Sequence, residues 1–226
     1  MQKLLAGVYK FKTEIFPKRQ ELFTELSSAQ NPRILFITCS DSRIDPNLVT
    51  QAAPGDLFII RNAGNIVPPH ERHAGGTTAA IEYAVSALKV KHVVVCGHTD
   101  CGAIKGAMAP EDLGELPHTS DWLGHTLAAV ATVRARHGGI RGEHLSELTE
   151  ENVVLQLRHL MTHPAVAAAI ASDALELHGW IYDIGHGDIR CYDERERAWR
   201  SVEAVYREQP ELAAEIAAGL PEHGDP

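Results

Sequence analysis

A short apolar run that ends in a glycine, a histidine and a cysteine constrains this chain more than any other stretch. Val93-Val94-Val95 is β-branched throughout, which is typical of a buried strand, and the run stops at Gly97. His98 and Cys101 follow, three residues apart, on what must be a short turn. An imidazole nitrogen and a thiolate placed in this way can bind one metal ion, and zinc favours this mixture of ligands.

A second buried strand ends in the same manner. The apolar run 34–37 is followed at once by Thr38 and Cys39. In an open parallel sheet, functional groups gather at the C-terminal ends of the strands, so we expect Cys39 to meet His98 and Cys101 there. Three protein ligands would leave the fourth tetrahedral position open, which is the arrangement of a catalytic rather than a structural zinc site.

Two charged residues lie close behind the first cysteine. Asp41 and Arg43 follow Cys39 by two and four residues, so both can reach the same site. A carboxylate beside zinc can bind the metal, or it can pair with a cation and stay off it, and Arg43 offers a permanently charged, bidentate partner. Two alternatives remain open. Asp41 could be a fourth ligand in a closed structural site, or the pair could merely brace the loop.

Taken together, the two motifs resemble those of the β-class carbonic anhydrases. The first is Cys-Ser-Asp-Ser-Arg at 39–43, and the second is His-x-x-Cys-Gly at 98–102. Between them, Phe-Ile-Ile-Arg-Asn-Ala-Gly-Asn at 58–65 is similar to the connecting segment of that family, and the resemblance extends to about residue 182. It implies a Zn²⁺ cofactor held by Cys39, His98 and Cys101, with Asp41 and Arg43 as the catalytic pair beside it.

The reaction that this resemblance implies is the reversible hydration of carbon dioxide to bicarbonate and a proton, by attack of zinc-bound hydroxide. A small apolar substrate needs apolar walls, for which Ile66, Val67 and Tyr83 are candidates, and Gly102 could offer its backbone N–H to bicarbonate. Two other functions stay open. A carbonyl sulfide or carbon disulfide hydrolase would use the same ligands, and a non-catalytic zinc- or bicarbonate-binding protein would act through its partners.

Composition limits the other classes of function. The net charge of −9 argues against nucleic-acid binding, and no stretch approaches the roughly 20 apolar residues of a membrane span. Lys10 and Lys12 interrupt the N-terminal apolar residues, unlike a signal peptide, so we expect a cytoplasmic protein. Its four cysteines are then more suited to metal binding or burial than to disulfides.

The pattern of apolar residues predicts an α/β fold, with a parallel-centred sheet flanked by helices. We expect one domain over 1–226, comprising a helical arm (1–30), a core (31–192) that ends in a β-hairpin, and a helical tail (193–226) whose helix covers about 199–218. The family resemblance implies a homodimer or homotetramer in which the arm contacts a second copy, although the apolar pattern alone also fits an arm packed on its own domain. The hairpin is a further candidate contact surface. The expected strands are about 33–38, 57–60, 92–96, 175–184 and 189–192, and the main helices are 2–28, 77–89, 103–108, 120–137, 143–162 and 165–171.

Overall fold

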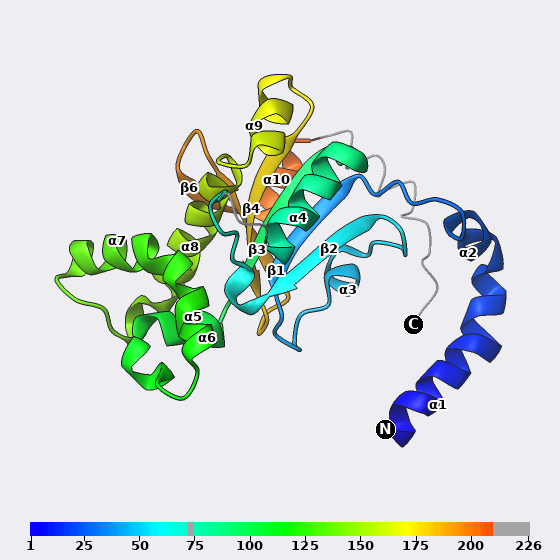
Figure 1. The fold of residues 1–226 in the computed structure, drawn as a ribbon, viewed down its shortest axis with the longest axis horizontal. Helices are drawn as coiled ribbons and strands as arrows, with labels where there is room; N and C mark the ends of the chain where they lie inside the picture. The colour runs from blue at the N-terminus through cyan, green and yellow to red at the C-terminus, as the bar shows by residue number, and fades with distance from the viewer. Residues whose placement is uncertain (72–74, 210–226) are drawn as a thin grey trace.

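The protein is built around one six-stranded sheet with the order β2-β1-β3-β4-β5-β6 (Figure 1). The structure is a computed structural model and describes residues 1–71 and 75–209. Four neighbouring strands run parallel, and the last two run antiparallel to their neighbours. In chain order the strands are β1 Ile34–Cys39, β2 Leu57–Asn62, β3 His92–His98, β4 Glu176–Asp183, β5 Asp188–Asp193 and β6 Ala198–Ser201.

The parallel register brings the C-terminal ends of the strands to one edge of the sheet. Ile37 of β1 lies between Ile60 of β2 and Val95 of β3. Continuing along β1, Cys39 lies beside the last residue of β2, while His98 ends β3. The two motif-bearing turns therefore leave the sheet on the same side, because both central strands run in the same direction.

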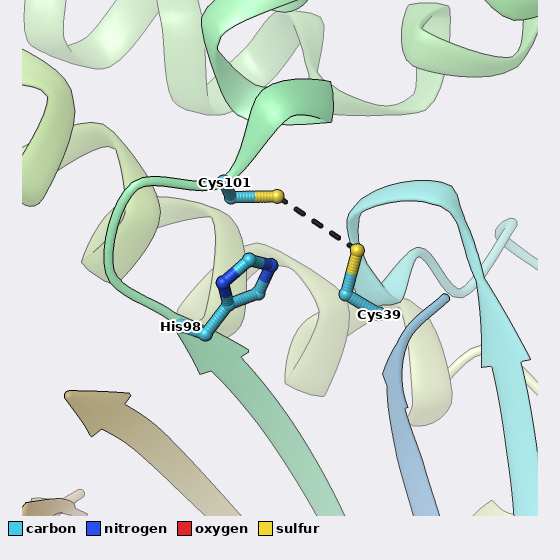
Figure 2. Close-up of side chains that lie close together, drawn as sticks. All are labelled: Cys39, His98 and Cys101. Atoms are coloured by element: carbon cyan, nitrogen blue, oxygen red, sulfur yellow. Dashed lines mark hydrogen bonds between the residues drawn. The ribbon is translucent and has the colours of Figure 1, made fainter. Parts of the chain in front are cut away.

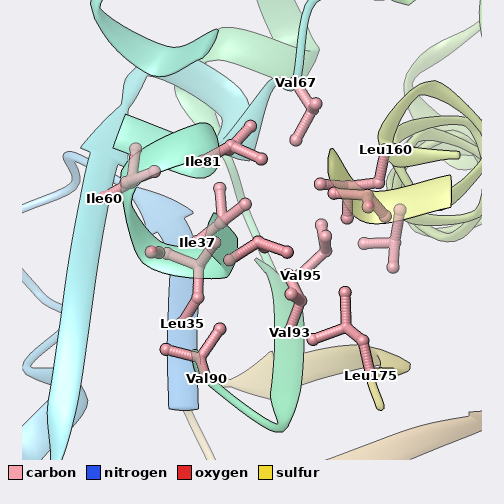
Figure 3. Packing of buried hydrophobic residues seen from close by; sticks show 14 of the residues in the cluster. Leu35, Ile37, Ile60, Val67, Ile81, Val90, Val93, Val95, Leu160 and Leu175 are labelled. Carbon is pink, nitrogen blue, oxygen red and sulfur yellow. The ribbon is translucent and has the colours of Figure 1, made fainter. Parts of the chain in front are cut away.

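The main hydrophobic core lies on one face of this sheet (Figure 3). Leu35, Ile37, Val93 and Val95 contribute its strand side, and each is completely buried. The helices that supply the opposite side are α4 Gly76–Glu82, its π-helical continuation Tyr83–Ala87, α8 Leu145–Leu160 and α9 Pro164–Ala171.

One glycine lets helix α8 approach the sheet closely. A Cβ atom at Gly97 would lie 2.9 Å from Val153 Cγ2 and 3.1 Å from Ile181 Cδ1. A Cβ contact as short as 2.9 Å is essentially never seen, so a larger residue at position 97 would force Val153 of α8 to shift. The glycine that precedes His98 thus serves packing as well as ending the strand.

A second group of helices covers the C-terminal edge of the sheet (Figure 1). The sequence here punctuates its helices with proline and glycine, and the segment expected as one helix over 120–137 is two helices joined by a 3-10 turn at Gly124–Thr126. The members are α5 Gly102–Met108, α6 Pro117–Leu123, α7 Leu127–His137 and the N-terminal part of α8, with short 3-10 turns at Pro110–Leu113 and Gly142–His144.

The N-terminal arm extends away from the body of the protein (Figure 1). It is helical, as predicted, although its helix is interrupted by π- and 3-10-helical turns, and none of its helical residues is buried. Its elements are α1 Gln2–Lys10, Phe11–Ile15, Phe16–Arg19 and α2 Gln20–Leu26. No helix in the two described ranges is both long and apolar enough to cross a membrane.

The expected strands and the β4–β5 hairpin are present, but the expected closing helix was wrong in its first part. Residues Ala198–Ser201 form β6, and helix α10 covers only Val202–Arg207. Trp199 explains the difference, because its ring packs on Tyr192 of β5 at 5.3 Å and lies under the Arg190 guanidinium. Such cross-strand pairs stabilise a sheet. The remainder of the expected helix, 210–218, lies outside the described residues, and the single-domain organisation stays a prediction.

Candidate active site

Three side chains from the two motif turns converge at the C-terminal edge of the sheet (Figure 2). Cys39 is the last residue of β1, His98 is the last residue of β3, and Cys101 directly precedes α5. Their potential ligand atoms all lie within 4.8 Å of one another, and all three residues are buried. The fold thus brings together the three residues that were predicted from the sequence to be metal ligands.

The histidine presents one ring nitrogen to this group without a partner. His98 Nδ1 lies 2.9 Å from the Thr99 carbonyl oxygen, to which it can donate a hydrogen bond. That bond fixes the tautomer in which Nε2 carries a lone pair, as is common for metal-binding histidines. Nε2 is buried and has no hydrogen-bond partner among the described residues. A buried acceptor without a partner is costly, and a metal ion would satisfy it.

The two cysteines are spaced as ligands of one zinc ion would be. Their sulfur atoms are 3.9 Å apart. Two thiolates bound at about 2.3 Å in a tetrahedron would be separated by about 3.8 Å. Hydrogen bonds from the Cys101 thiol, and then from the Gly64 N–H, lower the pKa of Cys39, whereas the Cys39 thiolate and burial raise the pKa of Cys101. A divalent cation between the sulfurs would stabilise both as thiolates, so the group fits zinc.

Asp41 and Arg43 form a charged pair at the rim of this group. The Asp41 carboxylate accepts hydrogen bonds from Arg43 Nε at 2.9 Å and Nη2 at 2.7 Å, and its Oδ1 also accepts from the Arg43 backbone N–H at 3.0 Å. These bonds hold the pKa of Asp41 well below its usual range. Asp41 Oδ2 remains 3.9 Å from His98 Nε2, so the carboxylate is near the candidate ligands while engaged by arginine.

Two further residues, which sequence reasoning did not assign to the site, hold this rim in place. Arg61 donates from Nε to the Cys39 carbonyl oxygen at 3.0 Å and from Nη2 to that of Asp41 at 2.6 Å. Asp100 accepts from Arg43 Nη1 at 3.3 Å and forms an ion pair with Lys105. The signal for Asp100 was its place inside the second motif, but only the fold shows that it faces Arg43.

The candidate substrate residues occupy different environments. Gly102 is exposed and follows Cys101 directly, at the start of α5. Ile66 and Val67 are completely buried, and Val67 belongs to the main core. Tyr83 is 48% exposed, and its ring packs on Phe58 at 6.0 Å. Of these four residues, Gly102 adjoins the cysteine–histidine group through the chain itself, because it directly follows Cys101.

Apolar side chains that the sequence did not single out surround the two cysteines. Ile44 is 3% exposed and Ile104 is completely buried, and both belong to the same hydrophobic cluster as Cys39 and Cys101. Their burial removes water from the sides of the cysteine–histidine group, which strengthens electrostatic interactions within it. Ile44 follows Arg43 and Ile104 lies on α5, so the motif turns supply this apolar wall as well as the candidate ligands.

The fold and this group together define an α/β zinc protein with three candidate protein ligands and a charged pair at the rim. Three protein ligands are one fewer than structural zinc sites use, which leaves a position for water or substrate. The pairing of Asp41 with Arg43 matters here, because a carboxylate held by arginine does not occupy that position. The arrangement is suited to activating a water molecule.

Comparison with known proteins identifies the family. The family described as carbonic anhydrase matches residues 34–189. A carbonic anhydrase of Synechocystis sp. is 48% identical over 195 residues, which cover 85% of this chain and 71% of the relative. A carbonic anhydrase of Pseudomonas aeruginosa is 44% identical over 214 residues, which cover 95% and 96% of the two chains. The chain belongs to the carbonic anhydrase family.

Solved structures refine this assignment to the β class. The structure of the β-carbonic anhydrase CcaA superposes with a TM-score of 0.85 at 46% identity, covering 89% of this chain and 98% of that one. One of two tetrameric β-carbonic anhydrases from Sordaria macrospora gives a TM-score of 0.72 at 35% identity, over 84% and 95% of the two chains. Zinc is accordingly the cofactor, in agreement with the chemistry of the cysteine–histidine group.

Proposed function

We propose that Cys39, His98 and Cys101 hold the catalytic zinc of this carbonic anhydrase, and that Asp41 and Arg43 act on the reacting water. The observation that carries the proposal is the buried, unpartnered Nε2 of His98 beside two cysteine sulfurs 3.9 Å apart. No disulfide joins these cysteines, which are free, and the hydrogen bonds that Cys39 makes with Cys101 and Gly64 leave His98 Nε2 without a partner among the described residues. The overall reaction is the reversible hydration of carbon dioxide to bicarbonate and a proton.

The chemistry that zinc supplies when bound is to make a water molecule acidic enough to act as a nucleophile near neutral pH. Two thiolates cancel the formal charge of the ion, so the water is less acidic than it would be beside three histidines. The chain must therefore assist by other means. The apolar wall around Ile44 and Ile104 excludes bulk water, and Asp41 provides an acceptor at the rim.

Asp41 is the residue that would orient the reacting water. Its carboxylate can accept a hydrogen bond from that water and so direct an oxygen lone pair toward the substrate carbon. Arg43 is a positioning residue, because its two side-chain hydrogen bonds keep Asp41 ionised and off the metal. Asp100 then holds Arg43 from the other side at 3.3 Å.

We propose that the four predicted residues bind the substrate, although the structure supports them unequally. Gly102 is the best placed, because it is exposed next to Cys101, and its small size permits close approach of bicarbonate. Ile66 and Val67 would act from behind the site by filling space, since both are completely buried. Tyr83 would contact substrate only if its exposed ring faced the access route, because it packs on Phe58.

The chain is proposed to form a homodimer or homotetramer, in which the N-terminal arm contacts a second copy. The relatives from Sordaria macrospora are described as tetrameric. The arm supports this proposal because its apolar side chains are exposed although their spacing is that of a buried helix face, notably Leu4, Leu5, Val8 and Phe11. Four free cysteines suit the reducing cytoplasm, where we propose that the protein acts on carbon dioxide without nucleic-acid or membrane partners.

The test is stopped-flow proton release after the zinc-loaded protein is mixed with carbon dioxide at mildly alkaline pH. Rapid release is expected in the parent protein and in Cys191→Ala, a matched control whose half-buried cysteine lies on β5. Release should be lost in Cys101→Ala together with zinc, and in Asp41→Ala with zinc retained. No release from protein with one zinc per chain would overturn the proposal and favour a carbonyl sulfide hydrolase or a binding protein.

A further inference from the structure

Two histidines and a glutamate come together at the N-terminal ends of β3 and β4, whereas the active site lies at the C-terminal ends of the strands. His92 is the first residue of β3, and Glu176 is the first residue of β4. The register of these parallel strands places His92 directly beside Glu176. His178 lies two residues beyond Glu176, so both side chains project from the same face of β4. Three potential metal ligands therefore meet where the two strands begin.

The distances within this group are those of a metal-binding tripod. His92 Nδ1 lies 3.2 Å from His178 Nε2, Glu176 Oε2 lies 3.5 Å from His92 Nδ1, and the same oxygen lies 3.7 Å from His178 Nε2. A point equidistant from the three atoms is about 2.0 Å from each of them, which is the length of a zinc–nitrogen or zinc–oxygen bond. A hydrogen bond between the two rings accounts for only the shortest of these contacts.

The surroundings favour the form of histidine that binds metals. Burial, and then the neighbouring imidazole of His92, lower the pKa of His178, which favours its neutral ring. Neutral imidazole is the ligand form. The side chains of His92 and His178 are 37% and 38% exposed, and that of Glu176 is 71% exposed. An ion can thus enter from solvent, and water can complete its coordination.

The geometry points to a second metal site, in which His92 Nδ1, His178 Nε2 and Glu176 bind a divalent transition-metal ion such as Zn²⁺. The site is separate from the active site, because His92 and His98 are the two ends of β3, about 20 Å apart at about 3.3 Å per residue. It has no thiolate and is partly exposed, so it binds zinc more weakly than the cysteine–histidine group and fills second. Occupancy fastens the start of β3 to β4 and stabilises the folded chain by mass action.

The test counts zinc ions in the intact holoenzyme and does not depend on the proposed function. Protein carrying one zinc per chain is dialysed against increasing free Zn²⁺, and bound metal is measured by elemental analysis. We expect the parent protein to bind a second equivalent of zinc. His178→Gln and His92→Gln should bind this second equivalent with at least 10-fold lower affinity. His186→Gln is the matched control, because this exposed histidine pairs only with Asp183 among the described contacts.

Cobalt then distinguishes the two sites by their ligands. Co²⁺ bound by cysteines gives a thiolate-to-metal charge-transfer band, whereas Co²⁺ bound by two histidines and a glutamate does not. The second equivalent should add visible absorption without that band, and Glu176→Gln should reduce this addition. Each variant must keep its first equivalent, which shows that it has folded. A parent protein that stops at one metal per chain, or a second metal that persists in both histidine variants, would overturn the inference.

Discussion

The candidate active site has a buried part and an exposed part, and the two are held in different ways. Cys39, His98 and Cys101 are enclosed by the strands and by an apolar cluster, whereas the side chain of Arg43 is 44% exposed and that of Asp100 is 57% exposed. Burial leaves His98 Nε2 without a hydrogen-bond partner among the described residues, so a bound metal would satisfy it, whereas solvent can replace a lost contact at the rim. The buried part should therefore determine whether zinc binds. The rim should determine how fast the zinc-loaded protein hydrates carbon dioxide.

The largest effect is expected at the buried cysteine. Cys101→Ala removes a candidate thiolate ligand from a completely buried position and leaves Cys39 and His98 unable to complete the site. We expect the variant to lose stoichiometric zinc and to show only the uncatalysed rate, as measured by elemental analysis and by stopped-flow proton release. Cys191→Ala should keep both zinc and activity. A Cys101→Ala protein that retains one tightly bound zinc and full activity would contradict the ligand assignment.

At the inner rim, Asp41→Asn should separate zinc binding from turnover. The amide keeps the shape of the side chain but is a poorer acceptor and cannot form the charged pair with Arg43. Hydration should slow by about 10²–10⁴-fold, the usual contribution of a proton-accepting group, while zinc stays bound. Steady-state hydration kinetics and a zinc count test this. Equal loss of zinc and activity would instead make Asp41 a metal ligand.

One residue further out, Arg43→Gln should have a smaller effect on the hydration rate and a clear effect on the pKa of Asp41. Arg43 holds the pKa of Asp41 lower in the folded chain than in the unfolded chain. Their ion pair therefore stabilises the fold at pH values above the unfolded-state pKa, and this stabilisation is lost as the pH falls through the folded-state pKa. In the variant the pKa of folded Asp41 should rise, so that its carboxylate becomes protonated at a higher pH than in the parent protein. Carbon-13 NMR titration of the carboxyl group measures this shift.

Activity of Arg43→Gln should fall about 10–100-fold, as for other residues that orient a metal site from outside it. Arg136→Gln is the matched control, since it breaks an ion pair with Glu147 and Glu151 between α7 and α8. That control should leave the pKa of Asp41 and the hydration rate unchanged. An unchanged titration of Asp41 in Arg43→Gln would show that the two residues do not interact in solution.

The smallest effect is expected at the outermost residue. Asp100→Asn weakens one contact of 3.3 Å to Arg43, which still donates two side-chain hydrogen bonds to Asp41. Exposed ion pairs contribute about 0–1 kcal/mol, so activity should fall at most about 5-fold. Hydration kinetics at low and high salt measure the loss, which should shrink with salt. A loss as large as that of Asp41→Asn would place Asp100 in direct contact with the reaction.

The buried part of the site was predictable from sequence because its signal is local. Each apolar run is followed closely by a candidate ligand, and parallel strands bring such ends together, so Cys39, His98 and Cys101 could be grouped before the fold was known. The rim was only partly predictable. Asp41 and Arg43 are neighbours in sequence, but the hydrogen bonds of Arg61 to the ligand loop depend on how β1 and β2 are aligned.

The remaining differences arise where tertiary contacts decide the structure. Residues 198–201 have no strong strand signal, and they join the sheet because Trp199 packs on Tyr192. The His92–Glu176–His178 group was likewise hidden, because its members are distant in the chain and meet only through the β3–β4 register. Ile66 and Val67 are completely buried, and their place in the substrate pocket stays a prediction.

The central claim is that two cysteines and one histidine hold zinc with a fourth position open. Zinc-edge X-ray absorption of protein carrying one zinc per chain tests it most directly. The account predicts two sulfur neighbours at about 2.3 Å and two nitrogen or oxygen neighbours at about 2.0–2.1 Å, with the features of a single imidazole. Loss of one sulfur neighbour in Cys101→Ala would agree with this assignment. A zinc shell without sulfur, or with three or more sulfurs, would contradict it.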